Sequence, residues 1–210
     1  MTSTHPTPRS VRLFVALPVP PSVRDSLRTP LDRLLPDDAR LRPTHPEGWH
    51  VTLAFLGDTP AARLTDVVDV VSAVLARRSL PDRVGLGSPG RFGDHTLWIG
   101  LDEEPPGSLG RLGADLQSDL AAADLPVRQR ELRPHITIAR ARRRHRVSQA
   151  DVRALEQAPG ISWRPAGVEI WQSHLGDGPA RYVIAASVAQ PDTGHQDREV
   201  GSDAATRDGS

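Results

Sequence analysis

The chain contains no cysteine and no lysine, and aromatic residues make up only 4% of its 210 residues. The absence of cysteine excludes disulfide bonds, catalysis by a thiolate and zinc sites built on cysteine. Because lysine is absent, all 26 basic residues are arginine, the side chain that fits phosphate oxygens with two parallel hydrogen bonds. No apolar run approaches the roughly 20 residues that a membrane-spanning helix needs, so no membrane association is expected.

The formal net charge is zero, so no overall field marks the chain as a nucleic-acid binder. Acidic residues are concentrated at the C-terminus, where residues 191–210 hold five acids and two arginines. We expect residues 1–9 and the acidic tail 190–210 to be disordered, and residues 10–189 to form a single domain. The N-terminus lacks the apolar core of a signal peptide, so a cytoplasmic protein is expected.

Apolar spacing along the chain alternates between the two-residue period of strands and the longer period of helices. Strands are expected at residues 11–17, 49–56, 83–88, 96–101, 133–140, 166–174 and 180–189, and helices at 22–35, 60–75, 107–123 and 148–157. Pro30 falls inside the first helix and predicts a kink or a break there. Thr59 and Ser148 are expected to cap the helices that follow them. The order predicts an α+β fold of two pseudo-symmetric lobes, each an antiparallel sheet with helices on its outer face, with a cleft between the lobes.

The pattern His-x-Thr-x occurs twice within short apolar runs. The first copy begins at His50 and includes Thr52, and the second begins at His135 and includes Thr137. Residues two apart on a strand project from the same face. Two such strands facing each other would place two imidazoles and two hydroxyls in one cleft.

Two opposed histidines suit displacement at the phosphorus of a phosphodiester. The attacking oxygen must lose a proton and the leaving oxygen must gain one, on opposite sides of an in-line phosphorus. Histidine exchanges protons near neutral pH, so one ring can act as base and the other as acid. The hydroxyls of Thr52 and Thr137 could donate to the non-bridging oxygens as charge develops there. This chemistry requires no metal ion and no cofactor.

The spacing alone carries little information, because a single His-x-Thr in a strand is commonly a structural, half-buried histidine. His5 and Thr7 show the same spacing, yet the prolines beside them exclude a central strand. The two internal copies differ because each lies in an apolar strand and each is followed by an apolar residue and alanine.

Several segments together resemble a known family. They are the opening strand Arg12–Pro18, the motif runs Trp49–Gly57 and Arg133–Arg140, the Leu-Trp-Ile-Gly run 97–100 and the late strand 170–175. In this order they are similar to the 2H phosphoesterase superfamily, and within it to RNA 2′,3′-cyclic phosphodiesterases, also called LigT-like or 2′-5′ RNA ligase proteins. The resemblance covers about residues 11–188. It departs at Arg181–Ile184, where relatives often have Tyr-Thr-Pro-Leu after the arginine.

The resemblance implies hydrolysis of an RNA or nucleotide 2′,3′-cyclic phosphate to a 2′-phosphate by a monomeric enzyme. It assigns His50 as the proton donor to the 3′ leaving oxygen and His135 as the proton acceptor from water. The reverse reaction, with a ribose hydroxyl in place of water, would be a 2′-5′ RNA ligase activity.

The resemblance also implies substrate-binding roles for Phe55 and Arg140, each five residues beyond its histidine. The aromatic ring would stack on a base and the guanidinium would contact phosphate or ribose. An odd offset, however, places both on the strand face opposite the histidine. Both strands must therefore twist or bulge if these residues belong to the site.

Three alternatives stay open at the level of sequence. The arginine-rich run 140–146 fits either an RNA backbone contact or a solvated loop. The cleft could belong to a non-catalytic module that binds RNA ends. A metal site built on the two histidines is a poor third reading, because only Asp58 and Asp94 lie in nearby loops as further ligands.

Overall fold

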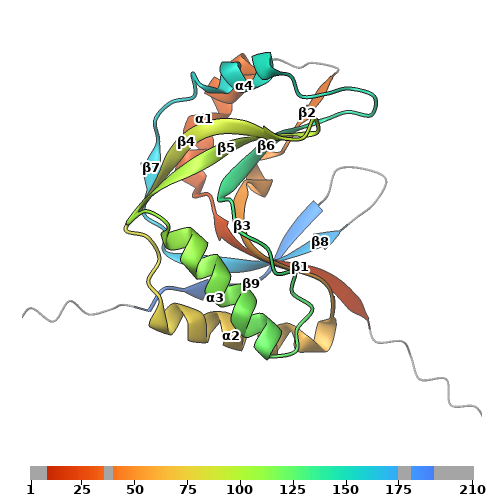
Figure 1. Ribbon diagram of the computed structural model, residues 1–210, viewed down its shortest axis with the longest axis vertical. Coiled ribbons are helices and arrows are strands. Elements are labelled where there is room, and N and C mark those ends of the chain that lie inside the picture. The colour runs from red at the N-terminus through yellow and green to blue at the C-terminus, as the bar shows by residue number, and fades with distance from the viewer. Residues whose placement is uncertain (1–8, 36–39, 175–180, 192–210) are drawn as a thin grey trace, which may run out of the picture.

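A computed structural model describes residues 9–35, 40–174 and 181–191 (Figure 1). The strands are β1 (Ser10–Pro18), β2 (Leu41–Pro43), β3 (His50–Pro60), β4 (Arg83–Phe92), β5 (Thr96–Glu104), β6 (His135–Ala141), β7 (Ser162–Trp163), β8 (Gly167–His174) and β9 (Arg181–Ala189). The α-helices are α1 (Pro21–Leu34), α2 (Leu64–Arg77), α3 (Ser108–Ala122) and α4 (Gln149–Leu155), and single 3₁₀ turns span Pro46–Gly48 and Ala61–Arg63. No helix in these ranges is long and apolar enough to cross a membrane.

The strands form an antiparallel sheet that is almost divided at its middle. Its order is β7-β4-β5-β6-β3-β1-β8-β9, and β2 also pairs with β6. The two motif strands, β3 and β6, are joined by one residue pair, Val51 with Ile136. The sheet therefore separates into an upper lobe around β6 and a lower lobe around β3 (Figure 1), which confirms the predicted α+β fold with two antiparallel lobes.

Helices cover the outer face of each lobe, as the apolar periodicity predicts. Helices α2 and α3 pack together below the lobe of β3, and α1 and α4 lie above the lobe of β6 (Figure 1). The apolar stripe of α3 is fully buried at Leu109, Leu112 and Leu116. Full burial of such side chains contributes about 1.5–3 kcal/mol each, so this packing fixes α3 against β3.

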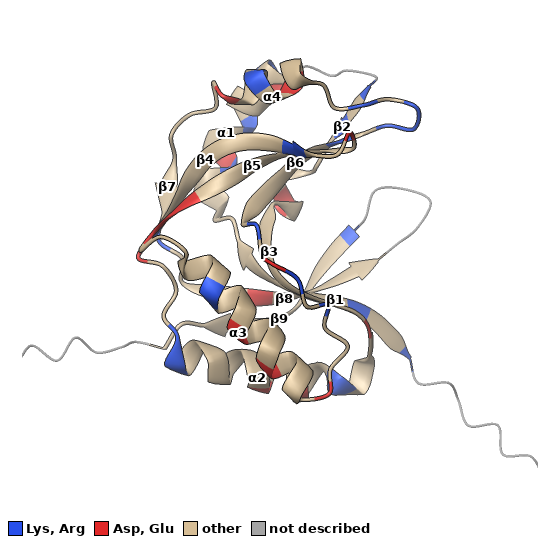
Figure 2. Cartoon of the chain, viewed as in Figure 1, with Lys and Arg blue, Asp and Glu red and all other residues tan. Residues whose placement is uncertain are grey.

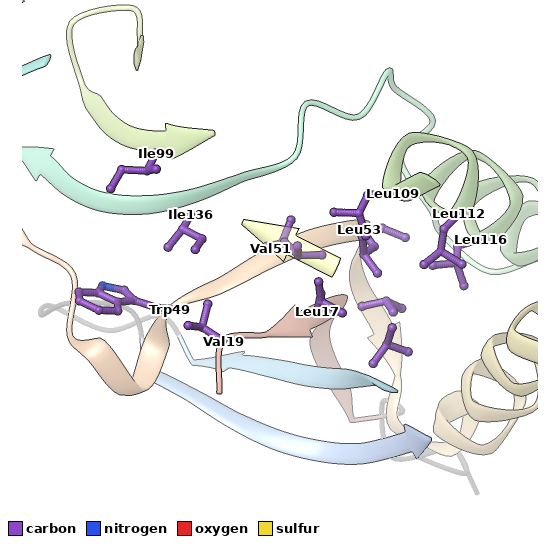
Figure 3. Close-up of a cluster of buried hydrophobic side chains, with 14 of the residues drawn as sticks. Leu17, Val19, Trp49, Val51, Leu53, Ile99, Leu109, Leu112, Leu116 and Ile136 are labelled. Carbon is purple, nitrogen blue, oxygen red and sulfur yellow. The ribbon is translucent and has the colours of Figure 1, made fainter. Parts of the chain in front are cut away.

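The core is continuous across the junction of the lobes. Val51 of β3 and Ile136 of β6 are fully buried at the pair that joins the lobes, and Ile99 of β5 packs in the same cluster (Figure 3). Close packing at this point fixes the orientation of one lobe relative to the other. The two motif strands are thereby held next to each other.

The two halves of the chain are interleaved between the lobes. After β3 the chain forms α2 in the same lobe, but the following hairpin β4–β5 pairs with β6. After β6 and α4 the chain returns, and the hairpin β8–β9 pairs with β1 beside β3. Neither half can complete its lobe without the other.

Three predicted helix features can be compared with the structure. Helix α1 is one segment that includes Pro30, so the helix is not broken there, and the kink stays a prediction. Helix α2 begins at Leu64 rather than after Thr59, because β3 continues to Pro60 and Thr59 pairs with Val11 in the ladder. The predicted cap at Ser148 is confirmed, since its hydroxyl and the Asp151 carboxylate form a capping box.

Some predictions fall on parts of the chain that are not described. Residues 1–8, 192–210 and the predicted turn at 175–179 lie outside the described residues. Gln190, at the start of the predicted tail, accepts a hydrogen bond from the Leu80 amide and donates one to the Leu75 carbonyl, both at 2.9 Å. The domain bounds 10–189 stay a prediction.

Candidate active site

A cavity of about 540 Å³ lies between the lobes and contains both motifs. Its lining comprises Arg12, Phe14, Arg42, Pro43, Thr44, His45, Gly48, His50, Thr52, Phe55, Phe92, Thr96, Arg130, His135, Thr137, Arg140, Ser173 and Tyr182. All six residues predicted for the site are among them. Among these described residues, four are arginines and none is acidic, so the cavity suits an anionic ligand.

A β-bulge follows the threonine of each motif. In β3 the register with β1 shifts so that Leu53 has no partner between Thr52 and Ala54. In β6 the register with β5 shifts in the same way at Ile138, between Thr137 and Ala139. Because a bulge adds one residue to a strand, the side chains beyond it project from the opposite face of the sheet to the one that simple alternation predicts.

The two bulges explain how residues five positions apart share one face. Beyond Leu53, Phe55 points into the cavity with His50, and beyond Ile138, Arg140 points into it with His135. The guanidinium of Arg140 also donates to the hydroxyl of Thr96, at 3.1 Å. The twist or bulge required by the sequence is therefore present in both strands.

Side chains from outside the motif strands hold each bulge in place. The hydroxyl of Thr44 lies within hydrogen-bond distance of the carbonyl oxygens of Thr137 (2.6 Å) and Ile138 (2.9 Å), and it accepts from the Trp49 indole at 3.1 Å. The Gln117 side chain of α3 donates to the Leu53 carbonyl at 3.4 Å. The Ile138 carbonyl also accepts from the Thr44 amide at 2.8 Å, so both bulge carbonyls have hydrogen-bond partners outside the motif strands.

Gln117 also connects the bulge of β3 to the segment that carries Arg130. Its buried side chain accepts a hydrogen bond from the Arg130 amide at 2.7 Å. One turn earlier on α3, Gly113 lets the helix approach β3 closely, since an added Cβ would lie 3.2 Å from the Leu53 carbonyl oxygen. Helix α3 therefore positions two parts of the cavity wall.

Both motif histidines are held in the same tautomer. Nδ1 of His50 lies 2.6 Å from the Gly48 carbonyl oxygen, and Nδ1 of His135 lies 2.7 Å from that of Arg133. A carbonyl oxygen only accepts, so each Nδ1 carries a hydrogen and donates it. In the neutral ring Nε2 is then free to accept a proton, and in the charged ring it can donate one.

His50 lies against an aromatic wall. Its ring centroid is 4.9 Å from that of Phe14, 5.1 Å from Trp171 and 5.4 Å from Tyr182. Burial among these rings lowers the pKa of His50 to about 4; the hydrogen bond to Gly48 opposes this shift, and the charges of His135 and Arg140 add to it. His50 is therefore neutral at pH 7 in the protein without a bound ligand.

His135 has a smaller aromatic contact and more arginine neighbours. Its ring packs edge-on against Phe92 at 4.8 Å. Burial lowers the pKa of His135, the hydrogen bond to the Arg133 carbonyl raises it, and the charges of Arg130, Arg140 and Arg133 lower it. An anionic ligand between the arginines would counteract the lowering at both histidines.

Several cavity residues were not predicted from the sequence. They are Arg12, Phe14, Arg42, Thr44, Phe92, Thr96, Arg130, Ser173 and Tyr182. Alternation in the first strand could have indicated Arg12 and Phe14, which are two residues apart on the face that meets His50. The others come from separate elements that only the fold brings together.

The arginine-rich run 140–146 divides into three kinds of residue. Arg140 enters the cavity, Arg142 donates to the Leu41 carbonyl at 3.3 Å and Arg146 pairs with Asp94 at 2.7 Å. Residues 143 and 144 are exposed. The loop that follows β6 is coloured blue for basic residues in Figure 2. Within the described residues no group of three or more histidine or acidic side chains could hold a metal ion.

A curled antiparallel half-barrel with two inward-facing His-x-Thr strands defines a LigT-type 2H phosphoesterase fold. The structure of E. coli LigT complexed with 3′-AMP superposes with a TM-score of 0.67 at 22% identity, over 86% of this chain and 98% of LigT. The family model of the 2′-5′ RNA ligase superfamily matches residues 21–177, and the chain belongs to this superfamily.

Curated relatives carry one common name. The chain is 36% identical over 100 residues to the RNA 2′,3′-cyclic phosphodiesterase of Geobacillus stearothermophilus, covering 46% of this chain and 31% of the relative. It is 27% identical over 176 residues to the E. coli protein of that name, covering 82% of this chain and 92% of the relative. The chain thus matches less than a third of the Geobacillus protein but nearly all of the E. coli one.

Proposed function

We propose that this chain is an RNA 2′,3′-cyclic phosphodiesterase, which hydrolyses the cyclic phosphate of an RNA end or a nucleotide to a 2′-phosphate. One observation carries the proposal: two histidines present Nε2 to a cavity lined by four arginines and no acid. The names of the curated relatives agree with this activity.

In the proposed reaction His135 acts as the base and His50 as the acid. His135 takes a proton from water, and the water oxygen forms a bond to phosphorus. The bond from phosphorus to the 3′ oxygen breaks, and His50 gives its proton to that oxygen. The product carries a 2′-phosphomonoester and a free 3′ hydroxyl. The two rings supply both proton transfers, so the scheme uses no metal ion or cofactor.

The low pKa of His50 requires the substrate to help it take up a proton. Raising the pKa from about 4 to its ordinary value of 6.5 needs about 3 kcal/mol. A phosphodiester charge about 4 Å from the ring contributes about 4 kcal/mol at the effective dielectric of a partly buried site. His50 therefore becomes an acid together with the binding of the anionic substrate.

The remaining predicted residues would bind the substrate. Thr52 and Thr137 are half-buried in the cavity wall beside the histidines and would donate to the non-bridging oxygens. Arg140 would pair with the phosphate, and Phe55 would stack on a base. Since both halves of the site come from one chain, we propose that a monomer is active, and we place it in the cytoplasm with RNA ends as its partners.

The direct test incubates the protein with nucleoside and oligonucleotide 2′,3′-cyclic phosphates in the presence of EDTA and identifies the product. We expect a 2′-phosphate, and loss of at least about 100-fold in kcat/KM for His50→Ala and for His135→Ala. His145→Ala, which changes an exposed histidine, is the matched control and should retain activity.

The outcomes separate the alternatives. A 3′-phosphate product would contradict the assigned duties of the two histidines. Tight binding of a cyclic-phosphate oligonucleotide without turnover would indicate a module that only binds RNA ends. Activity only after addition of a metal would point to a different mechanism. Formation of a 2′-5′ bond from a cyclic-phosphate end and a 5′ hydroxyl end would reveal the reverse, ligase reaction.

A further inference from the structure

Two arginines converge on the ring of Phe55. The guanidinium carbon of Arg12 lies 5.1 Å from the ring centroid, and that of Arg128 lies 5.3 Å from it. Both distances are within the range of a cation–π contact. Among the described residues, neither arginine forms an ion pair with an acidic side chain, so both charges are available to a ligand.

The two arginines reach Phe55 from separate parts of the chain, Arg12 from β1 and Arg128 from the irregular segment between α3 and β6. Arg12 lies on β1, where Phe14 pairs with Phe55 across the ladder. The amide of Arg128 donates to the Phe55 carbonyl at 2.9 Å. Two residues later, the Arg130 amide is held by Gln117. The convergence is therefore built by backbone contacts and does not depend on flexible side chains alone.

The position of this arginine pair along the cleft is set by the ladder. Pro18 pairs with His50, and each step of two residues along β1 moves away from the histidine through Ala16 and Phe14 to Arg12. The ring of His50 contacts Phe14, and Phe14 is the cross-strand neighbour of Phe55. Arg12, which pairs with Asp58, thus lies beyond Phe55, two residue pairs farther from the proposed catalytic histidines.

The cavity also holds more positive charge than one cyclic phosphate needs. A cyclic phosphodiester carries a single negative charge, and Arg140 and Arg130 already lie close enough to His135 to lower its pKa. Of the two arginines on Phe55, Arg12 lines the cavity, whereas Arg128 is an exposed residue whose guanidinium lies over the same ring. Together they form a second cationic centre around Phe55, the residue proposed to stack on the base. A phosphate on the 5′ side of the same nucleotide is the next anionic group of an RNA strand.

We propose that Arg12 and Arg128, held on the Phe55 ring, form a subsite for the phosphate on the 5′ side of the terminal nucleoside. This inference rests on the proposed function and specifies its substrate. The shared chemistry is a phosphate attached to the 5′ oxygen, either as a free 5′-monophosphate or as the phosphodiester that links the next nucleotide.

The test compares three substrates with the same nucleoside cyclic phosphate: one with a free 5′ hydroxyl, one with a 5′-phosphate and one extended by a nucleotide. We expect kcat/KM to rise by about tenfold or more with the second phosphate, as one net charge-assisted contact would give. If kcat/KM rises only for the substrate with the free 5′-phosphate, the subsite is one for mononucleotides. If kcat/KM rises for both the 5′-phosphorylated and the extended substrate, the subsite is one for RNA.

The preference is expressed as the ratio of kcat/KM with and without the second phosphate. The double variant Arg12→Gln, Arg128→Gln should reduce this ratio to within about twofold of one, and rising salt should reduce it in the wild-type protein. Arg153→Gln, an exposed arginine on α4, is the matched control and should keep the wild-type ratio. Thermal melting of each variant verifies folding. Turnover without any preference for the second phosphate, or an unchanged ratio in the double variant, would overturn the subsite. No turnover of any substrate would instead contradict the proposed function.

Discussion

The half-buried, neutral His50 should make the stability of this protein depend on pH. The ring has a pKa of about 4 in the folded chain and about 6.5 in the unfolded chain. Above pH 6.5 the ring is neutral in both states. As the pH falls from 6.5 towards 4, the unfolded state takes up the proton first, so stability that is present at neutral pH is lost.

The size of the loss follows from the two pKa values. Between pH 7.5 and pH 5, a shift from 6.5 to about 4 removes about 2 kcal/mol from the free energy of unfolding. In the His50→Asn variant the side chain keeps an N–H that can donate to the Gly48 carbonyl, but this side chain does not titrate. The variant should therefore lose about 2 kcal/mol less than the wild type over this pH interval.

Urea unfolding at pH 7.5 and pH 5, followed by circular dichroism, measures this difference. His145→Asn removes an exposed histidine and is the matched control, for which we expect the wild-type pH dependence. If His50→Asn and the wild type lost equal stability between these pH values, the ring of His50 would not be held neutral by its aromatic neighbours, and the reasoning would fail.

Three further predictions follow from the same site. The pKa values of His50 and His135 both lie below 6.5 in the free protein. Above that pH the histidine pair rarely carries the one proton that the reaction needs, so kcat/KM should fall by about tenfold per pH unit above about 6.5. A value of kcat/KM that stays constant up to pH 8 would contradict this prediction. Gln117→Leu leaves the Leu53 carbonyl and the Arg130 amide without their hydrogen-bond partner. Urea unfolding should then show that the free energy of unfolding falls by about 1–3 kcal/mol, and kinetic measurements should show an increased KM. Gln117→Glu still accepts from the Arg130 amide and should partly restore both the stability and the KM. Gly113→Ala places a Cβ 2.6 Å from Cδ2 of Leu132 and 3.2 Å from the Leu53 carbonyl oxygen. It should destabilise the protein by about 1–3 kcal/mol relative to Gly110→Ala, whose Cβ would meet nothing within 4 Å. Equal melting temperatures for the two variants would refute the close packing around Gly113.

The local patterns of the sequence predicted the helices and the longer strands, although not the short strands β2 and β7, and they indicated the two histidines proposed as the catalytic pair. Alternation around His50 and His135 indicated strands, and the four-residue stripe of α3 indicated its buried face. These features depend on neighbours in the chain, so they can be read without the fold. The start of α2 was predicted wrongly because Thr59 pairs with Val11 in the ladder, a contact across 48 positions that no local signal reveals.

The roles of Phe55 and Arg140 show where local reasoning ends. Their odd offset from the histidines predicts the wrong strand face, and only the bulges at Leu53 and Ile138 turn them into the cavity. These bulges are supported by Gln117 and Thr44, which lie far from them in the sequence. A bulge that depends on a side chain distant in the sequence cannot be predicted from the apolar pattern of the strand itself.

The sequence by itself determined the residue types available to the proposed site: two histidines and two threonines in apolar strands, and arginine as the sole basic residue besides histidine. The tertiary structure decided the arrangement. It interleaved the two halves so that β3 and β6 meet at one residue pair, and it placed His50 among Phe14, Trp171 and Tyr182. Residue type and spacing are local properties, whereas the pKa of a buried ring and the convergence of arginines depend on contacts between distant segments.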